Sequence, residues 1–158
     1  MLKIKLIVVS ELKSGPWKEL ADEYLKRLKP YAKVEIVEVA ETKFKNESER
    51  EKVQKAEAAK LVKAIPKNAF KICMDERGQH MSSQSFAARL DEWSNQGQTE
   101  LAFVIGGPLG LHKNVCSADT DVTLALSKFT MPHDEARVVL LEQIYRAITI
   151  LKNKTYHY

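Results

Sequence analysis

The strongest constraint on the fold is a run of apolar residues, Leu101-Ala102-Phe103-Val104-Ile105, followed at once by Gly106-Gly107-Pro108-Leu109-Gly110. A strand that is apolar at every position is typical of a parallel sheet with both faces covered. Glycines directly after such a strand lie at the carboxyl edge of the sheet, where open α/β sheets bind ligands. They also suit a plain tight turn, and this segment alone favours the two interpretations equally.

Strand-like and helix-like segments alternate along the rest of the chain. Further strands are expected at 3–9, 33–39, 70–74 and 122–126, and helices at 16–29, 48–65, 82–96 and 133–152. We expect Ser48 to cap the second helix and residues 75–79 to form a connection. The alternation predicts an α/β fold with a mainly parallel sheet, and 158 residues suit a single domain, 1–158.

The helices differ in the apolar faces they are expected to bury. The predicted buried positions are Trp17, Leu20, Tyr24 and Leu28 in the first helix, and Val53, Ala56, Ala59, Leu61 and Ile65 in the second. The last helix is apolar over most of its circumference and needs cover on more than one side. In a chain of this size we expect another subunit to supply the second cover.

Several classes of protein are disfavoured. The apolar runs fall far below the roughly 18 residues of a membrane-spanning helix, and no signal-peptide pattern opens the chain. Cys73 and Cys116 form neither a disulfide framework nor a metal-ligand set and are expected to be small buried residues. We therefore expect a soluble cytoplasmic protein with no membrane partner and a metal-free site.

The net charge of +4 is unevenly distributed. Residues 1–68 hold 16 of the 25 Lys and Arg residues, and the excess lies around Lys43, Lys45, Arg50, Lys52, Lys55, Lys60, Lys63 and Lys67. Such a surface can hold phosphates without reading sequence. Interleaved glutamates also suit a solvated helix with i,i+4 pairs, and charge alone favours that alternative.

Two further segments carry side chains suited to chemistry. His133 follows Met131-Pro132 at a helix start and could act as a base, contact a phosphate or make a structural hydrogen bond. The tail 152–158 mixes cations and aromatic residues, which suits RNA contact but also a frayed terminus. His80 and His112 have no partner at ligand spacing and are expected on the surface.

Together these segments resemble a known family. The motifs are Lys-Ile-Lys-Leu near the start, Val-Ile-Gly-Gly-Pro-x-Gly-Leu, Leu-Ser-Lys-Phe-Thr-Met-Pro-His, Arg137 to Ala147, and a terminal Tyr156-His157. They are similar to those of the RlmH family, the ribosomal large-subunit pseudouridine N3-methyltransferases of the SPOUT superfamily. The resemblance covers essentially the whole chain.

The resemblance implies a SPOUT-type α/β fold with a C-terminal trefoil knot, and a homodimer. It implies S-adenosylmethionine as methyl donor, bound by Met74, Gly106, Leu126, Ser127, Lys128, Phe129, Thr130 and Met131, with no metal. The implied substrate is a pseudouridine of large-subunit (23S) ribosomal RNA in the assembled ribosome, with residues 43–67 contacting phosphates. The alternatives are another rRNA or tRNA base, and a non-catalytic ribosome-binding module.

Methylation at N3 requires loss of a proton from a weakly acidic imide, so a base or a stabilising cation is needed. The candidates are His133, Arg137, Tyr156 and His157. By analogy with the family, the tail would act from the partner subunit.

Overall fold

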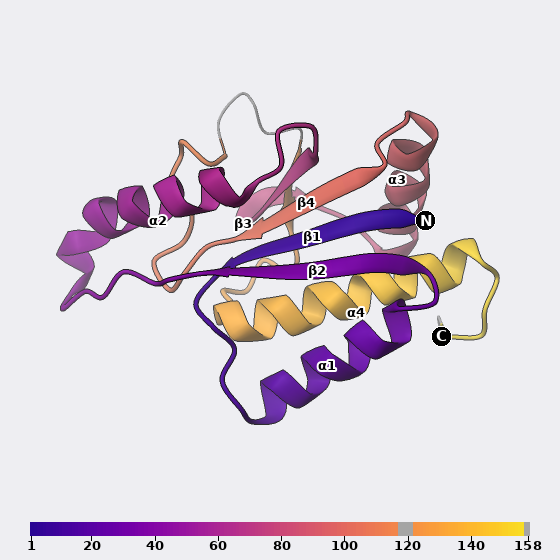
Figure 1. The fold of residues 1–158 in the computed structure, drawn as a ribbon, viewed down its shortest axis with the longest axis horizontal. Helices are drawn as coiled ribbons and strands as arrows, with labels where there is room; N and C mark the ends of the chain where they lie inside the picture. The colour runs from indigo at the N-terminus through magenta and orange to yellow at the C-terminus, as the bar shows by residue number, and fades with distance from the viewer. Residues whose placement is uncertain (117–121, 157–158) are drawn as a thin grey trace.

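The computed structural model describes residues 1–116 and 122–156, which build a five-stranded sheet with helices on both faces (Figure 1). The strands are β1 (Leu2–Val9), β2 (Ala32–Val39), β3 (Phe70–His80), β4 (Glu100–Ile105) and β5 (Val122–Ala125), in the order β2-β1-β4-β3-β5. All of the described strand pairs are parallel, which confirms the predicted α/β fold.

Helices cover the sheet unequally. Helices α1 (Pro16–Leu28), α3 (Ser83–Asn95) and α4 (His133–Leu151) contribute to one hydrophobic core, and α2 (Arg50–Ala64) contributes to the core on the other face. Residues 111–116 supply Leu111 and Val115 beside α2. Strand β4 lies between β1 and β3, and Leu101–Ile105 are buried, as its unbroken apolar sequence predicts.

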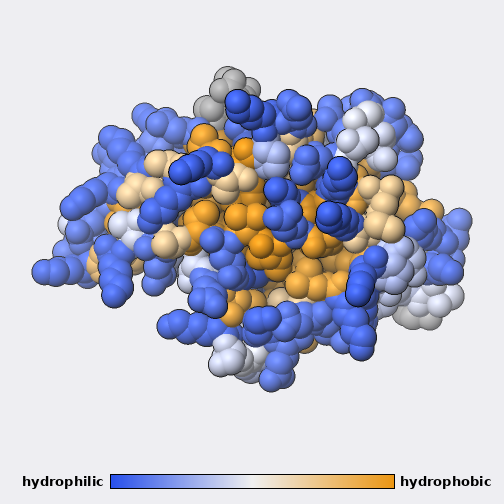
Figure 2. Space-filling model, viewed as in Figure 1, coloured by the Kyte–Doolittle hydropathy of each residue, from blue (hydrophilic) through white to orange (hydrophobic). Residues whose placement is uncertain are grey.

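Strand β2 forms one edge of the sheet, and its apolar residues serve both cores. Val34 and Ile36 pack against the core of α1, α3 and α4, whereas Val37 and Val39 pack against the core of α2. Figure 2 shows apolar side chains along the middle of this face of the molecule, where the sheet edge lies in Figure 1.

Two local predictions are wrong. Ser48 does not cap α2, whose N-cap is Glu49, with no side-chain cap hydrogen bond. Ser48 lies instead in a short 3₁₀ turn, Glu47–Glu49, which Asn46 caps by accepting a hydrogen bond from the Ser48 N–H at 3.0 Å. Residues 75–79 are not a connection, because β3 continues through them to His80 with a register shift against β5. A bulge of this kind keeps the strand going while breaking its alternation, which hides it from a periodicity search.

The predicted faces of α1 and α2 also need correction. In α1, Ala21 and Leu28 are buried, while Trp17 and Leu20 remain 40% and 44% exposed. In α2 the buried residues are Val53, Glu57, Ala58 and Leu61, so Ala59 faces solvent and the carboxyl group of Glu57 faces inward.

Helix α4 receives much of its cover within the chain. It lies beside both α1 and α3, and its buried residues include Leu140, Leu141, Ile144 and Ala147. Val139, Tyr145 and Ile150 are half-buried. Two neighbouring helices therefore cover much of α4 within one chain, and its half-buried residues are the part that another subunit could cover.

Three other predictions concern the trefoil knot, membrane-spanning helices and the two cysteines. Part of the β4–β5 connection, on which a trefoil knot would depend, lies in 117–121, outside the described residues. Within the described ranges, each helix is too short or too polar to span a lipid bilayer. Cys73 is buried and Cys116 is half-buried, and neither takes part in a disulfide within the described residues.

Candidate active site

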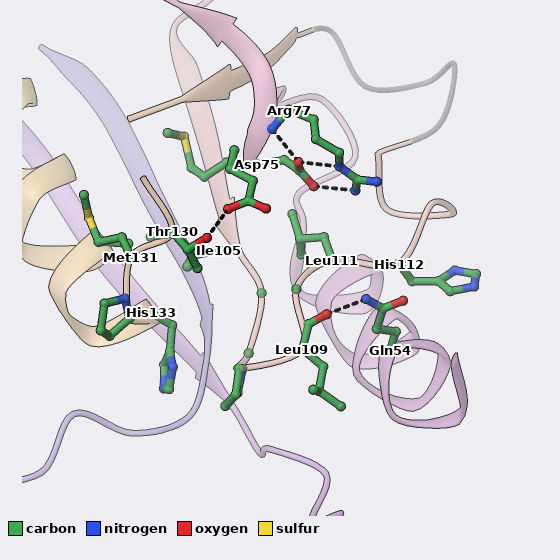
Figure 3. Close-up of a pocket in the computed structure, with 18 of the residues that line it drawn as sticks. Gln54, Asp75, Arg77, Ile105, Leu109, Leu111, His112, Thr130, Met131 and His133 are labelled. Atoms are coloured by element: carbon green, nitrogen blue, oxygen red, sulfur yellow. Dashed lines mark hydrogen bonds and ion pairs between the residues drawn. The ribbon is translucent and has the colours of Figure 1, made fainter. Parts of the chain in front are cut away.

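A cavity of about 1300 Å³ lies at the carboxyl ends of β4 and β5, beside the middle of β3. Four segments line it: 74–77 in β3, 105–113 after β4, 126–133 after β5, and the start of α2 (Figure 3). Parallel strands bring their carboxyl ends to one edge of a sheet, which is where α/β folds bind ligands. Two segments singled out in the sequence therefore meet at one cavity: residues 106–110, called the glycine loop below, and the loop before His133.

The glycine loop is a tight turn and a cavity wall at the same time. The N–H of Gly110 donates to the carbonyl of Gly107 at 2.9 Å, and Gly110 has a left-handed φ of 81°. A Cβ at Gly106 would lie 2.8 Å from the backbone carbon of Gly110. The turn itself therefore requires glycine at Gly106, and this tight turn also lines the cavity.

Helix α2 fixes this loop from the side. The carbonyl oxygen of Leu109 accepts hydrogen bonds from Arg50 Nη1 at 2.9 Å and from Gln54 Nε2 at 2.6 Å. Arg50 and Gln54 stand at i and i+4 of a helix, so both side chains reach the same point. Sequence reasoning counted Arg50 as part of a basic surface and missed this structural role.

The loop 126–133 is fixed by hydrogen bonds at two points. The N–H of Phe129 donates to Ser127 Oγ at 2.9 Å, and Thr130 Oγ1 donates to Glu76 Oε2 at 2.9 Å. The Thr130 contact joins this loop to β3 (Figure 3). The structure thus places a hydrogen bond between two of the segments that form the cavity.

Most of the predicted cofactor residues line this cavity. Met74, Gly106, Leu126, Ser127, Phe129, Thr130 and Met131 do so, whereas Lys128 is exposed beside it. Met74, Ile105, Leu126 and Met131 give the cavity apolar surface from β3, from the end of β4 and from the loop after β5.

An ion pair between Asp75 and Arg77 lies on the side of the cavity formed by β3. The Asp75 carboxylate accepts hydrogen bonds from Arg77 Nε at 2.9 Å and Arg77 Nη2 at 2.8 Å. Hydrogen bonding to Arg77 holds the pKa of Asp75 below its ordinary value despite partial burial. Asp75 is therefore an ionised acceptor at neutral pH.

His133 begins α4 and lines the cavity. Its Nε2 lies 3.4 Å from Asp134 Oδ1, a distance suited to an ion pair when the imidazole is protonated. The side chain is 22% exposed, so solvent or a substrate can reach it. Of the three predicted proton-handling residues that the structure describes, His133 is the one on the cavity wall.

Arg137, one helical turn further along, is not on the wall. Its side chain is 1% exposed, and Nη1 donates to Glu38 Oε1 at 2.6 Å while Nη2 donates to the Ser10 carbonyl at 2.8 Å. Ser10 has an uncommon φ of 76° for a non-glycine residue. Arg137 thus fastens α4 to the ends of β1 and β2, behind the site.

Tyr156 packs on its own subunit, away from the cavity. Its ring lies 4.9 Å from the guanidinium carbon of Arg146 and 4.8 Å from the ring of Tyr145. Its hydroxyl is 3.4 Å from both Tyr24 Oη and Glu142 Oε1. Burial raises the pKa of Tyr156, so the phenol is neutral at neutral pH. His157 lies outside the described residues.

The expectation that His112 is a surface residue is wrong. The side chain is 4% exposed, and Nδ1 accepts a hydrogen bond from the Asn114 N–H at 3.1 Å. The glycine loop folds back over α2 and buries it, which residue spacing could not indicate.

In the basic region of residues 43–67, some of the cations are paired and others are exposed. Glu51 and Lys55 form an i,i+4 pair at 2.9 Å, and Lys60 Nζ donates to the Ala40 carbonyl at 2.9 Å. Lys43, Lys45, Lys52, Lys63 and Lys67 are all exposed. The described residues contain no group of three or more His, Cys, Asp or Glu side chains placed to hold a metal ion.

Comparison with known proteins identifies the family. The family model described as "Predicted SPOUT methyltransferase" matches residues 2–157. The chain belongs to the SPOUT methyltransferase family. A probable methylase family protein from Haemophilus influenzae shares the fold of this SPOUT methyltransferase, with a TM-score of 0.53 and 13% identity over 99% of this chain and 70% of that one.

Two further solved structures are similar to this SPOUT methyltransferase. A Legionella pneumophila protein assigned as a methyltransferase was solved with the cofactor SAM (TM-score 0.49, 14% identity, 92% of this chain and 66% of that one). The SpoU methyltransferase AviRb from Streptomyces viridochromogenes was solved with AdoMet (TM-score 0.44, 12% identity, 96% and 58%).

Proposed function

We propose that this SPOUT methyltransferase transfers a methyl group from S-adenosylmethionine to N3 of a pseudouridine in large-subunit (23S) ribosomal RNA, on the assembled ribosome. The observation that supports this most is the meeting of two sequence motifs at one cavity. The glycine loop and the loop 126–133 carry the longest motifs of the resemblance to the RlmH family, and both line the cavity beside His133.

The residues of the cavity fit S-adenosylmethionine. About 1300 Å³ exceeds the 300–1,000 Å³ of typical small-molecule pockets, which leaves room for a base of the RNA beside a nucleoside. Met74, Ile105, Leu126 and Met131 would cover the faces of an adenine, and backbone groups of the two loops would bind its edge. When bound, S-adenosylmethionine supplies an activated methyl group.

The chain must then position the pseudouridine and remove the N3 proton. His133 Nδ1 would accept this proton, and Asp134 Oδ1, 3.4 Å from Nε2, would stabilise the resulting imidazolium. Arg137 would act as a positioning residue, because it holds the first turns of α4 against the Ser10 carbonyl and Glu38.

The tail would complete the site in a homodimer. Tyr156 and His157 would reach the partner's cavity, where the neutral phenol of Tyr156 could donate a hydrogen bond to the base. Exposed Trp17 and Leu20 on α1 support the dimer, because this apolar surface is left without cover in the single chain. A trefoil knot would bring the loop 126–133 and α4 into this arrangement.

The exposed lysines of residues 43–67 would bind RNA phosphates. Arg50 and Glu51 of the same region line the cavity, so a phosphate-binding surface there continues to its mouth. Because phosphate contacts position RNA without reading its sequence, selectivity would come from the shape of the assembled ribosome.

Mass spectrometry of ribosomal RNA tests the substrate. Nucleosides of 23S rRNA from a strain lacking this protein should contain no N3-methylpseudouridine, and purified protein with S-adenosylmethionine should restore it on ribosomes from that strain. Persistence of the modification in that strain contradicts the substrate, and a different methylated nucleoside would indicate another rRNA or tRNA target. Calorimetry identifies a non-catalytic module, which would bind no S-adenosylmethionine at millimolar concentration.

A further inference from the structure

The side chain of Phe129 is poorly explained by the fold or by a cofactor site. It is 86% exposed, the highest value among the large apolar residues that the structure describes. An isolated exposed apolar residue is common, but this one stands at the rim of the cavity, in the loop that joins β5 to α4. A ring so exposed covers little of any molecule bound deep in the cavity.

The loop presents this ring from a fixed backbone. The N–H of Phe129 donates a hydrogen bond to Ser127 Oγ at 2.9 Å. The hydroxyl of Thr130, the next residue in the chain, donates to Glu76 Oε2 at 2.9 Å. Pro132 then restricts the backbone before α4 begins. Because the flanking residues are already ordered, a ligand that contacts the ring loses little conformational entropy of the protein.

The surroundings of the ring favour a nucleobase. Lys128 precedes it and is exposed, Glu76 and Thr130 beside it are exposed polar residues, and Lys113 lies on the cavity wall. A protein partner would need an apolar area around a central aromatic residue, and these polar neighbours do not supply one. An unstacked base offers a flat face for the ring, and its phosphate suits the lysines.

We propose that the Phe129 ring stacks on an unstacked base of the substrate RNA at the mouth of the cavity, and so sets the affinity for RNA rather than for the methyl donor. This inference rests on the proposed function, because it requires an RNA substrate. The proposal gives the residues of loop 126–131 different roles. Leu126 and Met131 line the cavity, and Phe129 contacts the RNA.

Three variants test this in the full-length protein. Phe129→Leu keeps apolar bulk but removes the ring, Phe129→Trp keeps a ring, and Val62→Ala changes another exposed apolar residue, 50% exposed on α2. The measurements are calorimetry with S-adenosylmethionine, and KM and kcat for methyl transfer to ribosomes from the strain lacking the protein. Tryptophan fluorescence of Phe129→Trp on addition of ribosomes gives a direct signature of stacking.

Phe129→Leu should raise KM for ribosomes about tenfold, the usual effect of removing one stacked base, with the donor affinity within twofold of wild type. Phe129→Trp should retain the wild-type KM and show fluorescence quenching, and Val62→Ala should behave as wild type. A weakened donor affinity with unchanged KM in Phe129→Leu would overturn the proposal and place the ring on the donor; wild-type values throughout would also overturn it. Wild-type protein that methylates no RNA would instead contradict the proposed function itself.

Discussion

At the residue scale, the most informative side chain outside the cavity is Glu57 of α2. It is 2% exposed, Oε1 accepts a hydrogen bond from the Thr42 N–H at 3.1 Å, and Oε2 has no partner. A Cβ at Gly107 would lie 3.0 Å from Oε2, so this carboxyl group backs the glycine loop. Desolvation raises the pKa of Glu57 above its ordinary value of 4.5.

Glu57→Gln should change how stability depends on pH. A raised pKa means that the folded protein binds this proton more tightly than the unfolded chain, so stability is lost as pH rises from about 4.5 and Glu57 ionises. The neutral amide escapes this loss. Thermal unfolding from pH 4 to 8 should show the variant gaining roughly 2–4 °C over wild type toward high pH.

Glu51→Gln, in the same helix, provides the matched control. Lys55 lowers the pKa of the exposed Glu51, so its small contribution is present above the ordinary pKa and disappears as pH falls. The stability of Glu51→Gln should therefore differ little from that of wild type, with a small loss toward high pH in place of a gain. If Glu57→Gln is instead less stable than wild type by an amount that grows as pH rises, the fold requires the ionised carboxylate and the argument from burial is wrong.

At the element scale, sequence reasoning succeeded where one residue pattern decides the structure. Five apolar residues in a row predicted the buried strand β4, and Pro16 and Pro30 marked the first helix. Prediction from the sequence failed where contacts between distant segments determine the structure. The strand continues through 75–80 because β5 pairs with it, and His112 is buried because its loop folds onto α2.

The same division applies to the site. Sequence motifs named most of the cavity wall, because each follows a strand end directly in the chain. They could not show that Gln54 binds the glycine loop or that Arg137 is buried against Glu38, since 55 and 99 residues separate those partners. Such contacts depend on tertiary packing, which no local pattern records.

Arg137 of α4 contacts Glu38 of β2 and the Ser10 carbonyl after β1. Loss of Glu38 should lower the stability of the protein more than loss of Arg137. Glu38→Ala leaves a guanidinium that is 1% exposed without its carboxylate, which should lower the free energy of unfolding by about 3–5 kcal/mol. Arg137→Met should cost less, because Glu38 is 33% exposed and can turn toward water. Urea unfolding measures both, and equal losses would contradict the asymmetry.

At the scale of the whole molecule, the single chain leaves an apolar surface on α1 that a second copy would cover. Leu20→Glu should therefore convert the protein from dimer to monomer at micromolar concentration, as measured by light scattering after gel filtration. Val62→Glu, on α2, should remain dimeric. A dimer that survives Leu20→Glu, or that Val62→Glu disrupts, would contradict the proposed interface.

The tail gives a second prediction at this scale. Removal of residues 156–158 should leave S-adenosylmethionine affinity within about twofold of wild type, because Tyr156 packs on Tyr145 and Arg146 away from the cavity. Methyl transfer to ribosomes should fall at least about a hundredfold, the usual effect of removing one hydrogen-bond donor from an active site. Full turnover by the truncated protein would remove the tail from the active site.

The central claim is that the loops after β4 and β5, together with the middle of the neighbouring strand β3, bind one methyl donor. A crystal structure of the protein with S-adenosylmethionine tests this most directly. The nucleoside should lie between Met74, the glycine loop and residues 126–131, with its methyl group toward His133. A donor bound elsewhere on the protein, or absent from this cavity at saturating concentration, would contradict the account.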